Sequence, residues 1–564
     1  MVKDPGLVVD HKLAEPVAQR WRLLYGVMLA GLAAAYIRAL FIPLMNVDSG
    51  HHAMIAMHMI ESGDYAGLYF RGEDYLDKPH FLFWAVALSF KIFGVTAFAY
   101  KLPSLLFSLL AIYATYRLGR KLYDHRTGFL AGLIVSTAYA FVLANNDVRM
   151  DAILTGSIIF TIWQLIEVTS SRALKHVLLS ALGLALGFST KGMIGLAMPL
   201  VAIFFYLIQK RNWKMLLDLR WIYVGLLFVL FLLPEFYSFY VQFDAHPEKM
   251  IRGQAAPSGI AFLLFGQSLE RYQGGAWGST GSDDPIMFVH TFFWAFLPWC
   301  LVAVPALWQS VSWLVRNRFR DDAQYPLFLQ ATIGVIFLLI SGSQFKLPHY
   351  LNILLPLYAI VTAAYVIRME EERPALILLL QRIATMLMVI LVIVLNSYVF
   401  PPDSFGVGLV MAFFLVMYMV VGRMPRARAA LLTLAAAAFA YVALNFNFYP
   451  QMIRYQAGNM LADVLLEQNG VKDTVCYLEG HVEANGFDVQ VGRTIPVRSI
   501  EAVIRGTQRQ WIYTDDEGLE ALKKTGKPIE VIASNLDYRV SQLDMSLLNP
   551  RRRGKVGKHH LVRL

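Results

Sequence analysis

The chain has 564 residues, of which 57% are hydrophobic and only 16% are charged, and its mean hydropathy is +0.50. A soluble protein of this size does not need so much apolar surface, so the composition excludes a water-soluble globular fold and indicates a mainly α-helical, polytopic membrane protein. The net charge of +10 lies in short loops between apolar runs, as membrane topology requires, and therefore does not indicate nucleic-acid binding.

Apolar runs recur along the chain after a polar N-terminal segment, residues 1–20. A helix needs roughly 20 apolar residues to cross the hydrocarbon core, and about thirteen runs are long enough. The first run has no small-residue cleavage site after it, so we expect a retained helix rather than a removed signal peptide. The predicted spans are 21–44, 96–116, 127–146, 150–168, 174–190, 193–209, 220–241, 285–314, 325–343, 348–367, 374–399, 403–422 and 427–446.

The loops between these spans alternate in their content of Lys and Arg. RLGRKLYDHR, QKRNWKMLLDLR and GRMPRAR are strongly basic, whereas NNDVRMD, STKG and FKLPHY carry fewer basic residues. Because basic loops stay on the cytoplasmic side, the alternation predicts a cytoplasmic N-terminus. An odd number of spans then places the C-terminal tail on the periplasmic side of a bacterial inner membrane, together with the loop that follows the first span.

The predicted transmembrane domain covers residues 21–454 and has two long outside loops, 45–95 and 242–284. In the first loop, SGHHAMIAMHMIESGD is typical of a short helix lying on the membrane, and KPHFLFWAVALSFKIFG is too short to span, so we interpret it as interfacial or re-entrant. The second loop contains RGQAAPSG and RYQGGAWGSTGSDD and is either a functional lid or a simple connector.

After about residue 455 the hydropathy drops. The short β-like runs TVCYLEG, RQWIYTDD and PIEVIAS alternate with the helix-like EAVIRG and DEGLEALKKTG, so residues 455–564 are predicted to form a small periplasmic α/β domain. The basic end of this domain, NPRRRGKVGKHH, is either a solvated tail or a contact with anionic lipid head groups. The two cysteines, Cys300 and Cys476, lie in different regions and predict no disulfide framework.

Polar residues cluster where the first predicted span ends. A carboxylate at such a membrane exit is costly unless it is paired, solvated or used, so Asp48 belongs either to an ordinary wet loop or to an active site at the membrane face. A base that removes a proton from an acceptor hydroxyl needs such a position. His52 follows four residues later, so the two side chains can share a helix face and either hydrogen bond or supply two ligands to a divalent metal. His51 and His58 are too far apart along a helix to share one ion.

Lys78 lies at the far end of the same loop, in the sequence YLDKP. Pro79 holds it in an extended or turn conformation. A lysine there can neutralise a lipid-linked phosphate, or it can snorkel to lipid head groups as many lysines near membranes do.

Three further loops on the same predicted side contribute charged and polar residues. A channel would instead need polar groups along its spans, and the predicted spans are nearly free of charge. The four loops together therefore indicate a site at one membrane face. The residues of these three loops are Asp147, Arg149 and Asp151 in NNDVRMD, Lys191 in STKG, and Lys346, His349 and Tyr350 in FKLPHY.

The order and spacing of these residues resemble glycosyltransferase family 39. An Asp follows the first helix, a (D/E)KP tripeptide comes thirty positions later, and an Arg-x-x-Asp-like turn, a KG and a K-x-P-x-Y follow in turn. The chain is most similar to the bacterial aminoarabinose transferases that modify lipid A, and more distantly to protein O-mannosyltransferases. The resemblance covers nearly the whole chain and implies a GT-C fold with interfacial helices in the first external loop.

The resemblance also implies a reaction and its participants. These are an undecaprenyl-phosphate-linked sugar as donor, lipid A or another periplasmic acceptor, and contact with membrane lipids. Asp48 would be the catalytic base and Asp151 a second acidic residue at the reaction centre. The donor phosphate and sugar would be bound by Lys78, Arg149, Lys191, Lys346 and Tyr350.

Two positions depart from the family pattern. Where the family commonly has an acidic residue and then Arg-Tyr after the catalytic Asp, this chain has Ser49, Gly50, His51 and His52, and the glutamate of the EKP motif is Asp77. We therefore include His51, His52, Asp77 and His349 as further candidate site residues. No cofactor is required by the pattern, and a divalent metal stays an open alternative.

Three classes of function compete. The favoured one is a glycosyltransferase acting on lipid A or a related glycolipid, with a protein O-mannosyltransferase-like enzyme as its variant. The second is a non-catalytic flippase or transporter of lipid-linked sugars, which would need polar residues inside the spans or repeated halves. The third is an assembly subunit, which would not need Asp and Lys to converge on one face.

Overall fold

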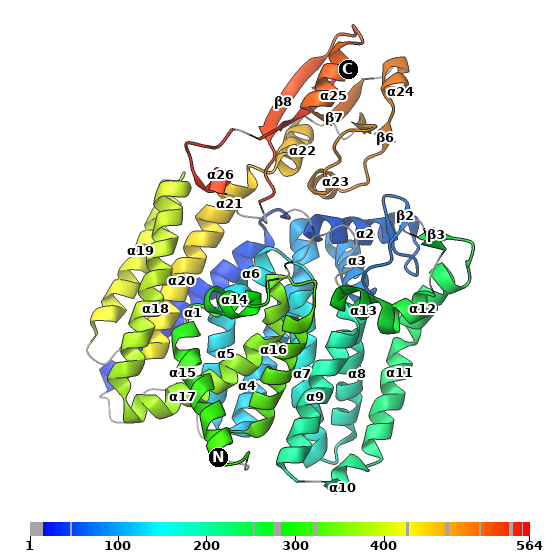
Figure 1. Ribbon diagram of the computed structural model, residues 1–564. Helices are drawn as coiled ribbons and strands as arrows, with labels where there is room; N and C mark the ends of the chain where they lie inside the picture. Colours follow the sequence, from blue (N-terminus) through cyan, green and yellow to red (C-terminus); the bar gives the residue numbers. More distant parts are fainter. Residues whose placement is uncertain are drawn as a thin grey trace.

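The computed structural model describes most of the chain. The described residues are 15–45, 48–211, 213–251, 254–255, 258–273, 282, 284–319, 324–424, 428–468, 473–506, 509–540, 545–554 and 556–564. They form a long bundle of helices with a small α/β domain at one end (Figure 1). The prediction of a mainly α-helical membrane protein with a C-terminal α/β domain is confirmed.

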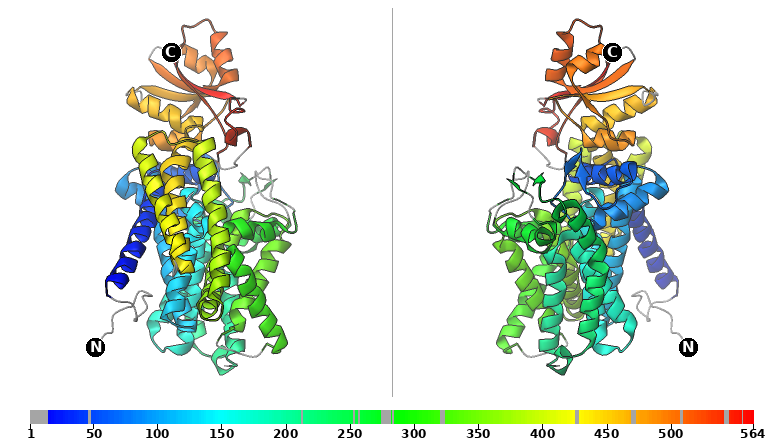
Figure 2. Two further views of the ribbon diagram at one scale, coloured as in Figure 1. Left: turned by 90° about the vertical axis from the view of Figure 1, so that its left-hand side faces the viewer. Right: turned by 90° about the vertical axis from the view of Figure 1, so that its right-hand side faces the viewer.

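The bundle helices run approximately parallel to one another over most of its length (Figures 1 and 2). Short irregular turns extend several of them: η1 (Tyr240–Asp244), η3 (Pro348–Leu354), η4 (Leu395–Val399), η5 (Leu444–Phe448) and α21 (Tyr449–Ile453). The bundle helices are α1 (Glu15–Leu40), α4 (Ala97–Leu122), α5 (His125–Thr137), α6 (Tyr139–Asn146), α7 (Asp151–Ser170), α8 (Leu174–Lys191), α9 (Met193–Gln209), α10 (Trp213–Leu216), α11 (Arg220–Phe239), α14 (Met287–Ala295), α15 (Cys300–Arg316), α16 (Leu327–Gly342), α17 (Leu355–Glu372), α18 (Pro374–Val394), α19 (Phe405–Arg423) and α20 (Ala429–Ala443).

Eight helices within the described residues are long and apolar enough to cross a membrane, and a ninth span is possible if the bent pair α5 and α6 is one span. Shorter apolar helices, such as α9, α15 and α16, add to the bundle. Every predicted span coincides with a helix or with consecutive helices. Two of the predicted spans are broken: α5 and α6 meet at an angle of 52°, and the run 285–314 divides into α14 and α15. Hydropathy alone does not register such breaks because the turns are themselves apolar.

The exposure of the bundle helices shows which of them face lipid. α7 and α20 are buried along most of their length, whereas only a small share of the residues of α11 and α19 is buried and many of their apolar side chains are exposed. An exposed apolar helix surface of this extent is a membrane-facing surface. These helices therefore make this a multi-pass membrane protein.

Two helices of the first long loop lie at the end of the bundle that carries the α/β domain: α2 (Asp48–Ser62) and α3 (Phe81–Phe93) (Figure 1). α2 lies across the bundle end, as predicted for SGHHAMIAMHMIESGD, and most of its residues are buried. α3 has only 13 residues, which is too short to span. A two-stranded hairpin, β1 (Tyr69–Phe70) and β2 (Glu73–Asp74), connects them.

The second long loop also folds against this end of the bundle. It contains a hairpin, β3 (Met250–Ile251) and β4 (Gln254–Ala255), and three short helical segments, α12 (Gly259–Ala261), η2 (Phe262–Gly266) and α13 (Gln267–Tyr272). Most of the glycine-rich stretch that was predicted to be a lid or a connector lies outside the described residues. Its described first part, α13, contacts the site discussed below.

The C-terminal domain contains one mixed sheet of five strands in the order β6-β5-β7-β9-β8. β5 pairs in parallel with β6 and β7, and β9 pairs antiparallel with β7 and β8. The strands are β5 (Thr474–Leu478), β6 (Val497–Arg498), β7 (Gln510–Asp515), β8 (Glu530–Leu536) and β9 (Lys558–Arg563), and the helices are α22 (Ala457–Glu467), α23 (Asn485–Val491), α24 (Ile500–Arg505), α25 (Asp516–Lys523) and α26 (Met545–Leu548).

The basic end of the chain was interpreted as a solvated tail or a lipid contact. Arg551 and Arg552 are exposed, as both alternatives expect, but other residues of this segment are folded into the domain. His559 and His560 belong to β9, an inner strand of the sheet. Arg553 packs 4.1 Å from the ring centre of Phe400 and donates hydrogen bonds to the backbone carbonyls of Val399 and Leu547, each at 2.6 Å. The composition concealed the strand because only two of its six residues, Leu561 and Val562, are apolar.

Two buried charged residues lie within helices that the sequence had suggested were nearly free of charge. Lys101 of α4 is 1% exposed, and its Nζ donates to the carbonyls of Ala39 and Ile42, at 3.0 and 2.8 Å, where α1 ends. Glu235 of α11 is equally buried and receives hydrogen bonds from the backbone and ring of His80, both at 3.0 Å. Lys101 thus fixes the end of α1, from which the first long loop starts, and Glu235 fixes His80 within that loop.

Candidate active site

A polar cavity of about 400 Å³ lies beneath α2 at the end of the bundle. Loops and helix ends that are far apart in the sequence form its walls. Ten of the eleven predicted site residues line it, together with residues that the sequence analysis did not single out. The lining residues are Asp48, His51, His52, Phe70, Glu73, Tyr75, Asp77, Lys78, Arg149, Met150, Asp151, Lys191, Arg271, Phe345, Leu347, His349 and Tyr350.

Asp48 is the first residue of α2, where a negative charge is favoured by the helix dipole. Its side chain is half exposed and lies 3.1 Å from Nη1 of Arg149. Burial alone would raise the pKa of this carboxyl, but nearby positive charge, that of Arg149 first of all, outweighs burial and lowers the pKa. Asp48 is therefore an ionised, accessible carboxylate that can accept a proton.

Arg149 connects several parts of the site. It lies in the short loop between α6 and α7, and besides Asp48 it contacts the carboxylate of Asp147 at 3.0 Å and Nδ1 of His349 at 3.2 Å. Arg149 thus contacts two carboxylates, those of Asp48 and Asp147, so this group of charges keeps one surplus negative charge.

Asp151 and Lys191 form a second ion pair at the base of the cavity. Asp151 begins α7 and its side chain is 3% exposed, and Lys191 ends α8 with its Nζ 2.9 Å from Oδ1 of Asp151. The same ammonium lies 4.3 Å from the ring centre of Tyr350. Gly192 follows with a φ of 65°, which lets the chain turn directly into α9 and leaves the lysine at the membrane boundary.

Asp77, Lys78 and Arg271 form a third group of charges. Oδ2 of Asp77 accepts from Lys78 at 2.6 Å, and Oδ1 accepts from Nη2 of Arg271 at 2.9 Å. Nη1 of Arg271 donates to the Tyr350 hydroxyl at 2.6 Å. Two cations share one carboxylate here, so this end of the cavity has one surplus positive charge and can bind a phosphodiester anion.

The sequence analysis missed Arg271. It comes from α13 of the second long loop and reaches Asp77 across 194 positions of sequence. The available signal was a lone arginine in an aromatic, glycine-rich loop on the predicted outer side, which does not by itself distinguish a site residue from a surface one.

His80 fixes the loop that carries Lys78. Its side chain is fully buried, and the ring nitrogens contact Glu235 at 3.0 Å and the Ala66 carbonyl at 2.8 Å. The imidazole thus connects α11 with the loop that follows α2. This attachment holds the neighbouring Asp77 and Lys78 in place.

His51 and His52 line the cavity beside Asp48. The ring of His51 stacks on Phe70 with a centroid distance of 3.8 Å. Burial lowers the pKa of His51 to about 4 and that of His52 to about 3, so both imidazoles are neutral near pH 7. Nε2 of His51 and Nδ1 of His52 are buried without a hydrogen-bond partner among the described residues. Neutral imidazoles of this kind can hydrogen bond to sugar hydroxyls.

Lys346 is the predicted site residue that does not line this cavity. Its neighbours Phe345 and Leu347 do, because the chain is extended here and successive side chains point to opposite sides. Lys346 is 5% exposed, and its backbone carbonyl accepts from the amide of Ser282 at 3.1 Å. The structure thus places it behind the wall of the site.

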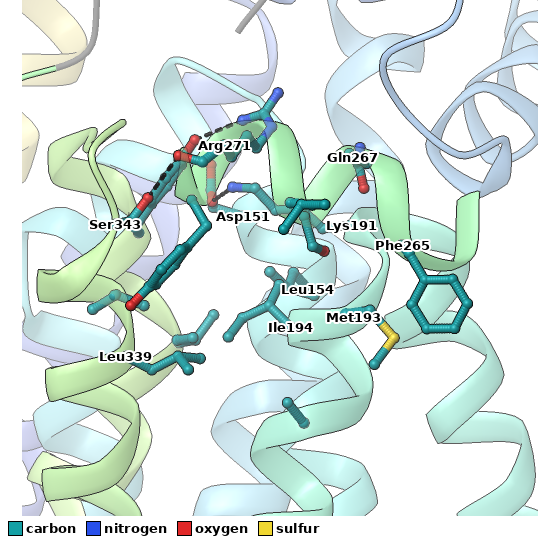
Figure 3. A pocket seen from close by; sticks show the side chains of 17 residues that line it. Asp151, Leu154, Lys191, Met193, Ile194, Phe265, Gln267, Arg271, Leu339 and Ser343 are labelled. Atoms are coloured by element: carbon teal, nitrogen blue, oxygen red, sulfur yellow. Dashed lines mark hydrogen bonds and ion pairs between the residues drawn. The ribbon is translucent and has the colours of Figure 1, made fainter. Parts of the chain in front are cut away.

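A second cavity, of about 570 Å³, adjoins the first and is mostly apolar. Figure 3 shows Asp151, Lys191 and Arg271 at one end of it and Leu154, Met193, Ile194 and Leu339 along its length. Asp151, Lys191, Arg271 and Tyr350 line both cavities. The exposed side chains of Phe265, Leu269 and Leu339 place its rim at the membrane-facing surface. A long apolar chain can therefore lie in the second cavity while its polar head reaches the first.

The described residues contain no group of three or more His, Cys, Asp and Glu side chains arranged to hold a metal ion. The carboxylates of Asp48, Asp77 and Asp151 are each paired with a cationic side chain instead. Within the described part of the chain, no third such side chain joins Asp48 and His52 in an arrangement that could hold a metal ion.

Comparisons with known proteins show which sequences and folds this chain is similar to. The family model described as dolichyl-phosphate-mannose-protein mannosyltransferase matches residues 77–237. An undecaprenyl phosphate-alpha-4-amino-4-deoxy-L-arabinose arabinosyl transferase of Pseudomonas aeruginosa is 25% identical over 341 residues, which are 58% of each protein. The enzyme of the same name from Yersinia enterocolitica is 30% identical over 179 residues, 31% of this chain and 32% of that one. The chain thus matches about 58% of the length of the relatives with the longer alignments.

The crystal structure of ArnT from Cupriavidus metallidurans bound to undecaprenyl phosphate superimposes with a TM-score of 0.70 and 16% sequence identity, covering 96% of this chain and 97% of that one. The fold is that of ArnT. The resemblance predicted from the order of the site residues is confirmed, and the ArnT-like fold extends over the bundle and the C-terminal domain. The matched relatives with a named activity are glycosyltransferases.

Lys78 allows a pH test of the phosphate-binding role. Burial lowers the pKa of its ammonium to about 8, although Asp77 opposes the shift. The charged ammonium is the form that binds an anion. It predominates below this pKa and is lost as the pH rises above it. We expect affinity for undecaprenyl phosphate to fall roughly tenfold between about pH 8 and pH 9.5, where the phosphate is already fully ionised.

The matched control is Lys78→Arg, whose guanidinium stays charged over this range. Its affinity, measured by native mass spectrometry or fluorescence titration in detergent, should hardly change with pH. An equal pH dependence in both proteins would contradict the role of the Lys78 ammonium.

Proposed function

We propose that this protein is a membrane glycosyltransferase that moves a sugar from a polyprenyl-phosphate donor to an acceptor hydroxyl at the same membrane face. The observation that carries the proposal is the continuity of the two cavities. The apolar cavity accommodates a prenyl chain, and the residues it shares with the polar cavity, such as Arg271 and Tyr350, lie where the donor phosphate would sit.

The charges of the polar cavity support this orientation of the donor. The surplus positive charge lies at Lys78 and Arg271, next to the apolar cavity, and the surplus negative charge lies around Asp48 and Asp147. A phosphate at the positive end places the sugar between the two groups. The acceptor then approaches from the side of Asp48.

The chemistry follows from this arrangement. Asp48 accepts the proton of the acceptor hydroxyl as its oxygen bonds to the anomeric carbon of the sugar. The bond between that carbon and the phosphate oxygen breaks, and the polyprenyl phosphate leaves with the electron pair. Lys78 and Arg271 stabilise the negative charge that develops on the leaving phosphate.

Lipid A or a related glycolipid is the acceptor we favour. The two named relatives are arabinosyl transferases with undecaprenyl-phosphate donors, and the site lies at the bundle end, where an acceptor in the outer leaflet can reach it. The second candidate is a protein acceptor, because the matching family model is described as a protein mannosyltransferase. His51 and His52, both neutral, suit a hydroxyl-bearing sugar.

Purified protein incubated with labelled undecaprenyl-phosphate sugars and either lipid A or a Ser/Thr peptide tests the proposal. We expect label in lipid A, recovered by mass spectrometry. Transfer to the peptide and none to lipid A would favour the protein O-glycosylating alternative. Movement of the donor across the bilayer of proteoliposomes without transfer to any acceptor would favour a flippase.

We further propose that the site and the C-terminal domain face the periplasm of a bacterial inner membrane. The strongly basic loops lie at the opposite end of the bundle, where α8 begins and α9 ends. A membrane-impermeant maleimide should label Lys524→Cys in intact spheroplasts and Lys175→Cys only after lysis. The native thiols of Cys300 and Cys476 are buried and give little background. The reverse pattern would overturn the orientation.

A further inference from the structure

The C-terminal domain forms hydrogen bonds with both ends of the segment that carries Asp48. Before α2, the side-chain amides of Gln456 and Asn459 both donate to the carbonyl of Leu44 at 3.1 Å. At the end of α2, the backbone amide and the hydroxyl of Thr494 donate to the carboxylate of Glu61, at 2.9 and 2.8 Å. These contacts join the C-terminal domain to both ends of the segment.

Between these two points, α23 lies directly against the first turn of α2. A Cβ atom on Gly50 would come within 3.0 Å of the Cβ of Asn485, so glycine permits this close approach. Gly50 lies two residues after Asp48. The C-terminal domain therefore contacts the turn of helix from which the candidate base extends.

The hairpin of β1 and β2 makes the most extensive polar contact with the domain, through Arg71. Nε of Arg71 lies 2.7 Å from Glu483, and Nη2 lies 2.9 Å from Asp488 and 3.1 Å from Oδ1 of Asn485. The guanidinium also lies 5.3 Å from the ring centre of Tyr477. Asp488 is fully buried, and breaking a buried ion pair by removing one partner is strongly unfavourable.

The backbone conformation of the turn does not favour an arginine at position 71. The contacts of its side chain therefore explain why an arginine is found there. Arg71 has a φ of 51° and Gly72 a φ of 86°, so both central residues of the two-residue turn are left-handed. Asn, Asp and Gly are the residues that suit such a turn. An arginine is held in this conformation by its contacts with the C-terminal domain.

The opposite side of the hairpin forms a wall of the polar cavity. Phe70, next to Arg71, stacks on His51 with an interplanar angle of 12°, and Phe70 and Glu73, which pair across the hairpin, both line the cavity. Two adjacent residues, Phe70 and Arg71, therefore form the wall of the site and the contact with the C-terminal domain.

We propose that Arg71 is a positioning residue, through which the C-terminal domain holds the hairpin and the first turn of α2 in the geometry that sugar transfer requires. The domain is thereby a part of the active site, although the residues it contributes at this interface do not line the cavity. The effect on turnover rests on the proposed function, whereas the effect on local order does not.

The test compares full-length variants of Arg71. Arg71→Asn removes the guanidinium but keeps a residue that tolerates the left-handed turn, and Arg71→Lys keeps the charge. Lys523→Asn is the control, because Lys523 is exposed on α25 and pairs only with Glu520 among the described residues. Hydrogen exchange is measured for residues 48–62, 69–75 and the strands β5 and β7, and kcat and donor KM are measured with labelled undecaprenyl-phosphate sugars.

We expect Arg71→Asn to exchange faster in the hairpin and in the first turn of α2 while β5 and β7 stay protected. Its kcat should fall about 100-fold with donor KM nearly unchanged, because the reacting groups are misplaced. Arg71→Lys should recover part of the protection from exchange and part of the kcat. Lys523→Asn should match the unmodified protein in both.

Two results would overturn the proposal. One is unchanged exchange or unchanged kcat in Arg71→Asn. The other is faster exchange throughout β5 and β7, which would make Arg71 a stability contact of the C-terminal domain. If the unmodified protein transfers no sugar, the proposed function fails, and the exchange pattern still decides whether Arg71 orders the hairpin.

Discussion

Asp48→Asn should abolish sugar transfer and leave donor binding almost unchanged. The amide cannot accept the proton of the acceptor hydroxyl, and loss of a general base lowers the rate by about 10³-fold. The donor phosphate is expected to lie at Lys78 and Arg271, which contact Asp77 and not Asp48. Single-turnover transfer and equilibrium binding of undecaprenyl phosphate measure the two effects separately.

A control substitution should remove a carboxylate that has no part in the site, and Glu520→Gln on the exposed face of α25 does so. Its transfer rate should equal that of the unmodified protein. If Asp48→Asn retains near-normal turnover, Asp48 is not the base, and Asp151, which lines the same cavity, becomes the candidate.

Arg271→Ala should strongly weaken binding of the donor. Lys78 and Arg271 share the carboxylate of Asp77, and together they leave one positive charge for the phosphate. Without the guanidinium, Asp77 neutralises Lys78 completely and Tyr350 loses its hydrogen bond at 2.6 Å. Hydrogen bonds to charged groups contribute about 1.5–3 kcal/mol each, so we expect a loss of about 100-fold in affinity.

The partner substitution distinguishes this explanation from simple loss of a contact. Adding Asp77→Asn to Arg271→Ala frees the ammonium of Lys78 and should recover part of the affinity for undecaprenyl phosphate. If the double variant binds no better than Arg271→Ala, the charge balance among these three residues does not govern binding.

Much of the fold was predictable because its signal is local. Apolar runs of membrane length marked the bundle helices, and alternation marked β5, β7 and β8. The interfacial α2 was predicted from its short, mixed sequence. What the sequence could not provide were features that arise between distant segments. The division of the run 285–314 into two helices and the inner position of β9 are examples.

The residues of the site likewise divide into those that a local sequence signal predicts and those that depend on contacts between distant segments. Asp48, Arg149, Asp151 and Lys191 follow or begin predicted spans, and Lys78 lies in the loop after the first span, so hydropathy placed these residues at one face before their contacts were visible.

Other residues of the site depend on the folded chain. Arg271 was missed because the sequence of a loop between two spans does not show which of its side chains point into the site. Its partner Asp77 lies 194 positions earlier. Lys346 was included because the sequence alone does not show which side chains of an extended segment face the cavity and which face away from it. Arg71 was indistinguishable from any surface arginine, since its partners Glu483 and Asp488 belong to another domain.

A cryo-electron microscopy structure with undecaprenyl phosphate tests the central claim, that the two cavities form one donor site. We predict density for the phosphate within hydrogen-bond distance of Lys78 and Arg271, and density for the prenyl chain along Met193, Ile194 and Leu339. A phosphate bound away from the polar cavity, or a prenyl chain that does not enter the apolar cavity, would contradict the account.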